Sequence, residues 1–360
     1  MRKLVTFRNV KELTPIEGAD RIELAKIDGW QCVVKKGDFE VGDQGLFFEI
    51  DSLLPSTDSR FAFMAPRKFR VKTMKLKGAL SQGLLMPTSI LTFDEAEQLA
   101  MTPIEVDMAK FLGVILYEPP VPIAGKQKGT FPLAIVPKTD QERIQNIPDM
   151  LNGTTILDFE VTEKLDGTSC TIWMHVPLAC VMKHASVEEA KHAAIGVASR
   201  NWEMQKDDEN VYAKMLRENY LVDKLWQLGR NIAIQGEIVG PAVQGNKYQL
   251  AKQELYVFDI YDIDAKKYLS RDERHCLVVA MELKHAPILN YYKIFANAPS
   301  AQPIQHGDEN RNLTLDLVLE AANGKSELNP NVMREGLVFK RTDGSFSFKA
   351  ISNEWLLKYE

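Results

Sequence analysis

The stretch Glu163-Lys164-Leu165-Asp166-Gly167-Thr168 decides the interpretation of this 360-residue sequence. Residues 156–162 before it alternate largely between apolar and polar side chains, and residues 169–174 after it include β-branched and aromatic types. Both patterns predict β-strands, so the stretch is a turn between two strands. An exposed lysine on an ordinary turn would give the same pattern, and the meaning of the motif therefore depends on what accompanies it in the chain.

Four further segments accompany the lysine motif in a fixed order between residues 163 and 349. They are Ser199-Arg200-Asn201, Gln235-Gly236-Glu237-Ile238, Tyr256-Val257-Phe258-Asp259-Ile260, and Glu335-Gly336-Leu337-Val338-Phe339-Lys340 with Phe348-Lys349. With these segments the chain resembles the covalent nucleotidyltransferase superfamily of ATP-dependent ligases and capping enzymes. In that superfamily the nucleophilic lysine lies in a K-x-D-G motif between two strands, which implies that Lys164 is the catalytic residue.

The chemistry that the resemblance implies explains the residue types. Lys164 would attack the α-phosphorus of ATP and expel pyrophosphate, for which its amine must be neutral, although a free lysine has a pKa of about 10.4. Desolvation, or a divalent metal such as Mg²⁺ or Mn²⁺ beside the amine, favours the neutral form, and the metal also offsets charge on the phosphate. Such a metal prefers oxygen ligands, and the resemblance assigns Asp166, Glu237 and Glu335 to it.

Fixed cations are expected to complete the ATP site. Lys340 and Lys349 lie on the two strands of a predicted final hairpin about Asp343-Gly344, so both could face one site. Arg200 is suited to ribose and phosphate oxygens because its planar guanidinium binds them in a fixed geometry. Superfamily members commonly have two lysines spaced K-x-K in the last motif. Here Lys349 has Ser347 before it and Ile351 after it at that spacing, so the second cation comes from elsewhere, with Lys340 as one candidate, or is absent.

The remaining nucleotide contacts come from the resemblance alone. Arg143 matches an upstream element of RNA ligases, although it could also be an ordinary arginine on a helix face. Phe258 would stack on the adenine, but a core aromatic on a strand would look the same. The backbone carbonyl of Glu163 would read the purine amino group, and Gly167 completes the nucleotide-binding motif.

The first 115 residues predict a different kind of domain. Short apolar runs recur there at intervals of about 8–12 residues between turn signals, a pattern typical of a small barrel. The stretch 67–77 adds a row of cations without an acid, and an OB-like barrel commonly binds oligonucleotides. The cations that we expect to contact nucleic-acid phosphates, besides Arg67, are Lys68, Arg70, Lys72, Lys75 and Lys77.

Together these patterns predict an α+β chain with three parts. Residues 1–115 form an OB-like nucleic-acid-binding barrel, and residues 116–130, rich in proline and glycine, form a linker. Residues 131–360 form a nucleotidyltransferase (ATP-grasp-like ligase) domain with antiparallel sheets and flanking helices. In this domain, residues between Val211 and Leu228 recur at helical spacing ahead of Gly229, and a capping box at residues 270–273 opens a helix through Leu283.

The order of the domains identifies a branch of the superfamily. DNA ligases and capping enzymes resemble one another in carrying an OB domain after the last motif, whereas only residues 350–360 follow Lys349 here. Segments 18–23 and 75–84 resemble the N-terminal OB module of the fifth family of ATP-dependent RNA ligases. That resemblance implies sealing of nicks with a 3′-OH and a 5′-phosphate, a ribonucleotide at the 3′-OH end, and a bridging strand of RNA or DNA.

Composition indicates the class of protein and the compartment in which we expect it. The net charge is −5, with 45% hydrophobic and 26% charged residues, so any contact with nucleic acid must come from local cationic clusters. No stretch approaches the length of a membrane span, and the N-terminus turns polar too soon for a secretory signal. The four cysteines form no C-x-x-C pair. We therefore expect an intracellular monomer, in the cytoplasm or nucleus.

Two alternatives remain open from the sequence. The first is a capping guanylyltransferase that uses GTP, which labelling with ATP and GTP would distinguish. The second is an RNA-binding protein that keeps the fold without catalysis, for which a missing lysyl-nucleotide would be the sign.

Overall fold

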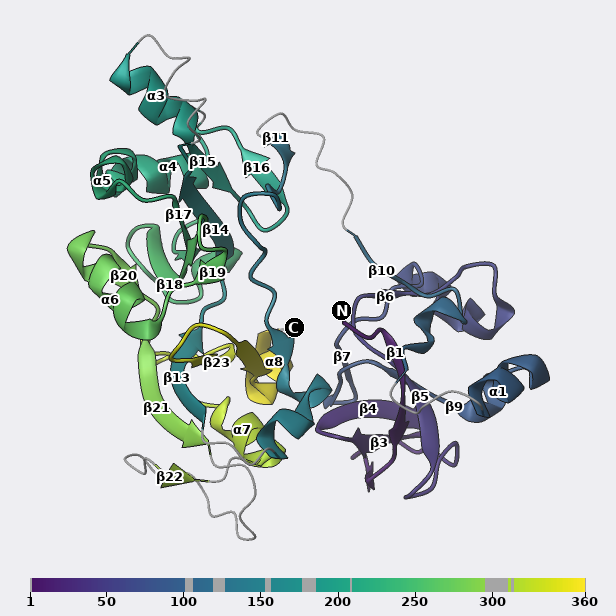
Figure 1. Cartoon of the computed structure of the whole chain (residues 1–360). Helices are drawn as coiled ribbons and strands as arrows, with labels where there is room; N and C mark the ends of the chain where they lie inside the picture. Colours follow the sequence, from purple (N-terminus) through teal and green to yellow (C-terminus); the bar gives the residue numbers. More distant parts are fainter. Residues whose placement is uncertain are drawn as a thin grey trace. The chain divides into compact units, whose positions relative to one another are not determined.

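The computed structural model describes residues 2–100, 106–118, 127–152, 157–176, 186–207, 209–294, 310–311 and 314–359. The chain divides into two compact units (Figure 1). Met1–Val121 and Asn353–Glu360 form the first unit, and Pro122–Ser352 forms the second. The predicted linker, residues 116–130, lies partly outside the described residues.

The first unit is built from short strands, as the interrupted apolar runs of its sequence predict. The strands are β1 (Val5–Asn9), β2 (Glu12–Pro15), β3 (Ile22–Ile27), β4 (Trp30–Lys35), β5 (Gln44–Phe48), β6 (Ser52–Leu53), β7 (Met74–Leu76), β8 (Ala79–Ser81), β9 (Leu84–Pro87) and β10 (Ile115–Leu116). They pair antiparallel in the orders β1-β5-β9, β2-β3-β4, β7-β8 and β10-β6. The helical segments are η1 (Ser59–Arg67), η2 (Thr88–Ile90), α1 (Phe93–Ala100), η3 (Met108–Lys110) and α8 (Asn353–Tyr359).

Strand β5 is covered on both of its faces. Leu46 and Phe48 belong to one buried apolar cluster, whereas Phe47 between them belongs to a second cluster and lies against Trp30, with ring centroids 5.3 Å apart. Successive side chains point to opposite faces of a strand. The strand therefore separates two small cores, as expected where short strands wrap around one another.

Helix α8 clusters with the first unit, whereas the sequence analysis assigned its residues to the C-terminal domain. The side chain of Asn353 accepts a hydrogen bond from Gln82 Nε2 at 2.8 Å, and the Leu357 carbonyl accepts one from Lys75 Nζ at 3.3 Å. These contacts join residues more than 270 positions apart. Local sequence patterns do not reveal such pairings, which explains the difference.

The second unit contains two sheets. The first sheet has the order β11-β16-β15-β14-β17-β18-β19, with β20 also paired to β18. Its strands are β11 (Gln127–Thr130), β14 (Thr168–Met174), β15 (Ile195–Ala198), β16 (Trp202–Met204), β17 (Ile232–Val239), β18 (Glu254–Asp262), β19 (Lys267–Tyr268) and β20 (Lys284–His285). The helices α3 (Val187–Ala194), α4 (Val211–Glu218), α5 (Leu221–Leu228) and α6 (Arg271–Ala280) contribute apolar residues to the core that this sheet shares.

The second sheet has the order β12-β24-β23-β13-β21-β22. Its strands are β12 (Glu142–Arg143), β13 (Leu157–Lys164), β21 (Ile288–Ile294), β22 (Asn310–Arg311), β23 (Gly336–Arg341) and β24 (Ser347–Ile351). The helix α7 (Leu315–Ala321) packs with this sheet in a separate core, and three short segments, η4 (Ile144–Asn146), η5 (Pro148–Asn152) and η6 (Gln244–Asn246), complete the unit. Pairing is mainly antiparallel, with parallel exceptions at β12–β24, β18–β20 and β21–β22.

Alternation along β13 separates apolar from charged side chains. Phe159 and Val161 lie in the apolar core with α7, so Glu160, Thr162 and Lys164 belong to the opposite face of the strand. The neighbouring strands β23 and β24 follow the same rule, because their apolar residues enter that core as well. One face of the second sheet thus packs in this apolar core, and the opposite face carries Glu160, Lys164, Lys340 and Lys349.

Two predicted helices differ from the structure in extent. The helical pattern from Val211 to Leu228 forms two helices, α4 and α5, because Tyr220 between them adopts a left-handed conformation with φ of 53°. Gly229 ends α5 in the left-handed region, as predicted. The capping box of Ser270 and Glu273 is confirmed, but α6 ends at Ala280 rather than Leu283. Among the described residues, the helices are all too short or too polar to span a membrane.

Candidate functional site

The lysine motif passes from one sheet of the second unit to the other. Lys164 is the last residue of β13 in the second sheet, and Thr168 is the first residue of β14 in the first sheet. At Gly167 a Cβ atom would lie only 2.2 Å from the Ile238 carbonyl oxygen on β17. A larger residue would push the turn off that strand, so glycine is required where the lysine leaves its sheet.

Carboxylates from three elements gather around Lys164. Its Nζ lies 2.6 Å from Glu335 Oε1, and Glu335 directly precedes Gly336, the residue paired with Lys164 across β13 and β23. Glu237 on β17 is nearby, and burial raises its pKa to about 8. Within that net shift, the charge of Lys164 lowers the pKa of Glu237, and the charges of Glu335 and Asp166 raise it. Asp166, Glu237 and Glu335 are therefore close enough to interact electrostatically.

The three carboxylates suit a divalent metal ion. Carboxylate oxygens are the ligands that Mg²⁺ and Mn²⁺ prefer, and like charges brought together need a cation to stabilise their ionised forms. In the part of the chain that the structure describes, Glu335 Oε2 is buried without a hydrogen-bond partner. An oxygen of this kind is available to a ligand from outside the protein. The residues present therefore fit the expected metal.

Asp166 is bound by two residues that were not predicted from the sequence. The ammonium of Lys247 forms an ion pair with its carboxylate, and Tyr248 Oη accepts a hydrogen bond from its backbone N–H at 2.7 Å. Burial raises the pKa of Tyr248, so its hydroxyl stays neutral. Both residues follow η6, a segment without a motif, and only their sequence adjacency to the Glu237 strand could have suggested them.

Several cations lie close to Lys349 on β24 of the second sheet. The pKa of Lys349 is lowered to about 8, mainly by burial and also by the charges of Lys164, Arg143 and Arg200, against the opposing effect of Asp140. Arg143 is the register partner of Lys349 on β12, and Arg200 Nη2 lies 3.0 Å from Asp140 Oδ1. Several cations held close together at one end of a sheet form a site suited to phosphates.

We predict that Lys349→Met stabilises the ligand-free protein at neutral pH and impairs lysyl-nucleotide formation. The pKa of Lys349 is about 8 in the folded chain and 10.5 ordinarily, so between these values only the unfolded chain keeps the proton. The free energy of unfolding therefore rises with pH across that window, and the buried charge destabilises the fold below it. Thermal unfolding of both proteins should show a higher Tm for the variant at pH 7 and a smaller difference at pH 10. An equal or lower Tm at pH 7 would contradict the prediction.

Phe258 lies at a bulge in β18. Gln235 pairs with Asp259 and Gly236 pairs with Val257, which leaves Phe258 as the extra residue. Val257 and Ile260 both enter the core with the helices, so the bulge also places Asp259 on the opposite face. Phe258 is only half-buried while its neighbours are buried. A half-buried aromatic residue at a bulge suits a side chain that stacks on a ligand.

Lys340, predicted as a phosphate-binding cation, has partners within the protein. It is 5% exposed, and its Nζ lies 2.5 Å from both Asp259 Oδ2 and the Phe258 carbonyl oxygen. Glu163 is also buried, and its carboxylate accepts the backbone N–H of Glu327 at 2.8 Å. The structure thus brings Arg143, Arg200 and Lys349 together, whereas Lys340 contacts Asp259 and the backbone of β18.

The predicted nucleic-acid cations of the first unit fall into two groups. Lys68, Lys72, Lys75 and Lys77 are exposed. Arg70 instead forms an ion pair with Asp51 at 2.6 Å and stacks 3.9 Å from the ring centroid of Tyr117. Its guanidinium is thus committed within the fold, which sequence could not reveal because Asp51 and Tyr117 lie far from it in the chain.

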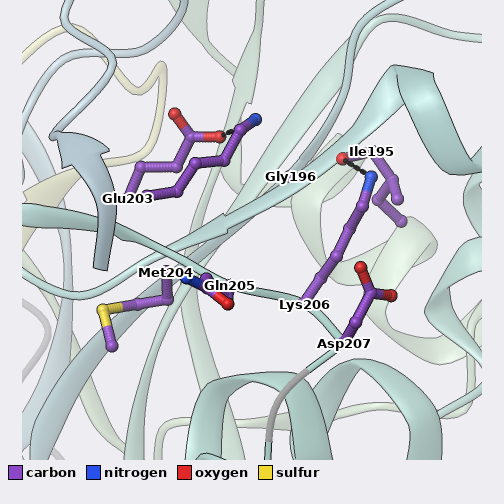
Figure 2. Close-up of a pocket in the computed structure, with 8 residues that line it drawn as sticks. Ile195, Gly196, Glu203, Met204, Gln205, Lys206 and Asp207 are labelled. Carbon is purple, nitrogen blue, oxygen red and sulfur yellow. Dashed lines mark hydrogen bonds and ion pairs between the residues drawn. The ribbon is translucent and has the colours of Figure 1, made fainter. Parts of the chain in front are cut away.

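A cavity of about 260 Å³ lies beside β11, β15 and β16 of the first sheet (Figure 2). It is lined by Lys128, Ile195, Gly196, Glu203, Met204, Gln205, Lys206 and Asp207. Figure 2 shows the ammonium of Lys206 against the carbonyl oxygen of Ile195, which it approaches to 3.1 Å. This lysine satisfies carbonyls at the end of α3, and the lining includes none of the residues around Lys164.

Comparisons with known proteins agree with this arrangement. A family model of an OB-fold domain matches residues 4–88, and a family model of RNA ligases matches residues 157–351. An apo variant of Naegleria gruberi RNA ligase aligns with 39% identity and a TM-score of 0.77, over 99% of this chain and 98% of that chain. Variants or complexes of the same enzyme with PPi, and with ATP and Mn, align with 39% identity and TM-scores of 0.76 over 99% of both chains. No curated protein matches. The predicted fold, an OB-like unit followed by a ligase domain, is confirmed.

Proposed function

This chain belongs to the RNA ligase family, and from that premise we propose that it uses ATP to join 3′-OH and 5′-phosphate RNA ends at nicks. The observation that carries the proposal is the position of Lys164, against Glu335 and within reach of Glu237 and Asp166. The solved structures of Naegleria gruberi RNA ligase with ATP and Mn, and with AMP and Mn, support ATP and a divalent metal as its partners.

The proposed reaction has three steps in which each bond formed replaces one broken. The neutral Lys164 amine attacks the α-phosphorus of ATP, forming a P–N bond as pyrophosphate leaves. An oxygen of the RNA 5′-phosphate then attacks the phosphorus of the lysyl-AMP, forming a P–O–P bond as the P–N bond to Lys164 breaks. Finally the RNA 3′-OH attacks the phosphorus of the RNA 5′-phosphate, forming the phosphodiester as the P–O–P bond breaks and AMP leaves.

Each residue in the site has a defined part in these steps. Arg143, Arg200 and Lys349 bind phosphate oxygens, and their positive charges stabilise the transferring group. Phe258 stacks on the adenine, and the Glu163 carbonyl faces its amino group. Asp166, Glu237 and Glu335 would hold the metal, which supplies charge compensation at the α-phosphate.

Mass spectrometry of the intact chain tests the first step directly. After incubation with ATP and Mn²⁺ we expect one added AMP, removable by pyrophosphate. Incubation with GTP is the control, because addition of GMP instead would indicate a capping guanylyltransferase. No added nucleotide from either would favour an RNA-binding protein without catalysis.

We further propose that the enzyme acts as a monomer inside the cell, where Cys32, Cys170 and Cys276 stay free thiols.

We predict that the exposed cations of the first unit serve RNA capture and not adenylylation. Replacing Lys68, Lys72 and Lys77 together by glutamine should weaken binding of nicked duplexes and leave lysyl-AMP formation largely intact. The slope of log affinity against log salt should become shallower by roughly 0.9 for each RNA phosphate that the variant no longer neutralises. Lys75 is left in place because it donates to the Leu357 carbonyl.

The matched control replaces Lys11, Lys26 and Lys36 by glutamine, which removes the same charge from the same unit. An unchanged salt slope in the first variant, or an equal loss of affinity in the control, would show that this cationic stretch does not contact RNA.

A further inference from the structure

A buried group of charged residues joins the two sheets of the second unit. Arg274 on α6 has no exposed surface, and its guanidinium pairs with the carboxylate of Glu160, which is 1% exposed and lies on β13. The Nε of Arg274 also donates to His285 Nε2 at 3.1 Å. Since α6 packs with the first sheet and β13 belongs to the second, Arg274 links them directly.

The same group reaches the bulge in β18. Arg274 Nη1 lies 3.9 Å from Asp259 Oδ1, and the other Asp259 oxygen lies 2.5 Å from Lys340 Nζ. Lys340 is also the register partner of Glu160 and lies 2.5 Å from the carbonyl oxygen of Phe258. The negative charges of two buried carboxylates thus offset the positive charges of Arg274 and Lys340. This group surrounds the backbone of Phe258.

The neighbouring histidines do not turn this group into a metal site. Side-chain atoms of Glu160, His275 and His285 lie within 4.8 Å of one another. However, Arg274 pairs with one oxygen of Glu160 and donates to His285 Nε2, while the other Glu160 oxygen lies 2.7 Å from His275 Nε2. A metal ion bound by all three residues would have to displace the guanidinium from His285 Nε2. Burial lowers the pKa of His285 to about 3, so it is neutral and accepts the hydrogen bond from Arg274.

We propose that Arg274 is a positioning residue that aligns the adenine-stacking strand with the nucleophile. Glu160 lies four residues before Lys164 on β13, and Asp259 directly follows Phe258 on β18. Contact with both acids therefore fixes the lysine relative to the ring. A displacement of about 1 Å between reacting groups can cost roughly 100-fold in rate.

The use of charges in place of apolar packing supports this role. A buried ion pair adds little stability over well-packed apolar residues, but removal of one partner is strongly destabilising because it leaves an uncompensated charge. Its directional contacts instead select one arrangement of the elements that carry them. The inference rests on the proposed function, since it assigns Phe258 to adenine and Lys164 to the α-phosphate.

A pair of variants separates positioning from stability. Arg274→Met should lower the Tm and raise the KM for ATP. The double variant Arg274→Met with Glu160→Gln removes both charges, so its Tm should recover toward wild type, while its KM for ATP stays raised by about fivefold or more. Formycin triphosphate, a fluorescent isomer of ATP, reports the stacking, and its fluorescence change on binding should stay reduced in the double variant. Arg271→Met serves as the control: this arginine of the same helix is paired at the surface with Asp272 and lies 5.1 Å from the ring centroid of Tyr291 on β21, without contacting Glu160 or Asp259 in any ion pair that the structure describes.

If the double variant recovers Tm, KM and the fluorescence change together, Arg274 is structural only and the inference is wrong. If its Tm stays low, the same measurements are made on Arg274→Lys, which keeps the charge and shortens the reach. A KM and fluorescence change equal to wild type in that variant would also overturn the inference. Absence of lysyl-AMP in the wild-type protein would instead overturn the proposed function.

Discussion

Replacing Lys164 by alanine should abolish the addition of AMP to the protein and the sealing of ordinary 5′-phosphate ends. Two other lysines described near the site have carboxylate partners of their own: Lys349 lies 3.7 Å from Asp140, and Lys247 is paired with Asp166. Sealing of RNA that already carries a 5′-adenylate should survive in part, because that step does not pass through the lysine. Intact-mass measurement and a sealing assay on both substrates check the two halves of the prediction.

A second lysine substitution provides the control for this experiment. Lys252→Ala removes an exposed lysine from the second unit and should leave both reactions near wild type. Residual lysyl-AMP on the Lys164→Ala variant would mean that another residue carries the nucleotide. Equal loss of both sealing reactions would mean instead that alanine disturbs the turn between the sheets.

The sequence alone was sufficient for the parts of the site that lie on local motifs. The strand–turn–strand about Lys164 is visible because alternating side chains and the Asp-Gly pair are local signals. Glu237 and Glu335 could be named only through the resemblance. The structure adds the reason for their proximity, since β17 and β23 each pair with a strand of the motif.

Contacts between distant residues could not be predicted in this way. Lys247 reaches Asp166 across 81 positions, and Arg274 reaches Glu160 across 114. The bulge at Phe258 depends on register with β17 and has no sequence signature. The partners of Lys340 depend on a contact of the same kind. Alternation along β23 indicates which face of the strand carries Lys340, but only its packing against β18 shows that it meets Asp259.

The last prediction concerns the proposed metal site. We expect each of the variants Asp166→Asn, Glu237→Gln and Glu335→Gln to lower the rate of lysyl-AMP formation by more than about tenfold. Each change removes a charged oxygen ligand and preserves side-chain size. Glu335→Gln should be the most severe, because this residue both pairs with Lys164 and presents a buried oxygen without a partner. Mn²⁺ binding, measured by electron paramagnetic resonance without ATP, should also weaken in each variant, and most in Glu335→Gln.

A surface carboxylate tests whether charge alone explains such losses. Glu203→Gln breaks an exposed pair with Lys128 and should change neither rate nor Mn²⁺ affinity. Chelation of the metal should stop adenylylation in the wild-type protein, and added Mn²⁺ should restore it. If two of the three site variants keep wild-type rates and Mn²⁺ affinity, the metal lies elsewhere. The carboxylates would then serve only to hold Lys164 and its turn against β17, a role in which asparagine or glutamine could still donate and accept hydrogen bonds.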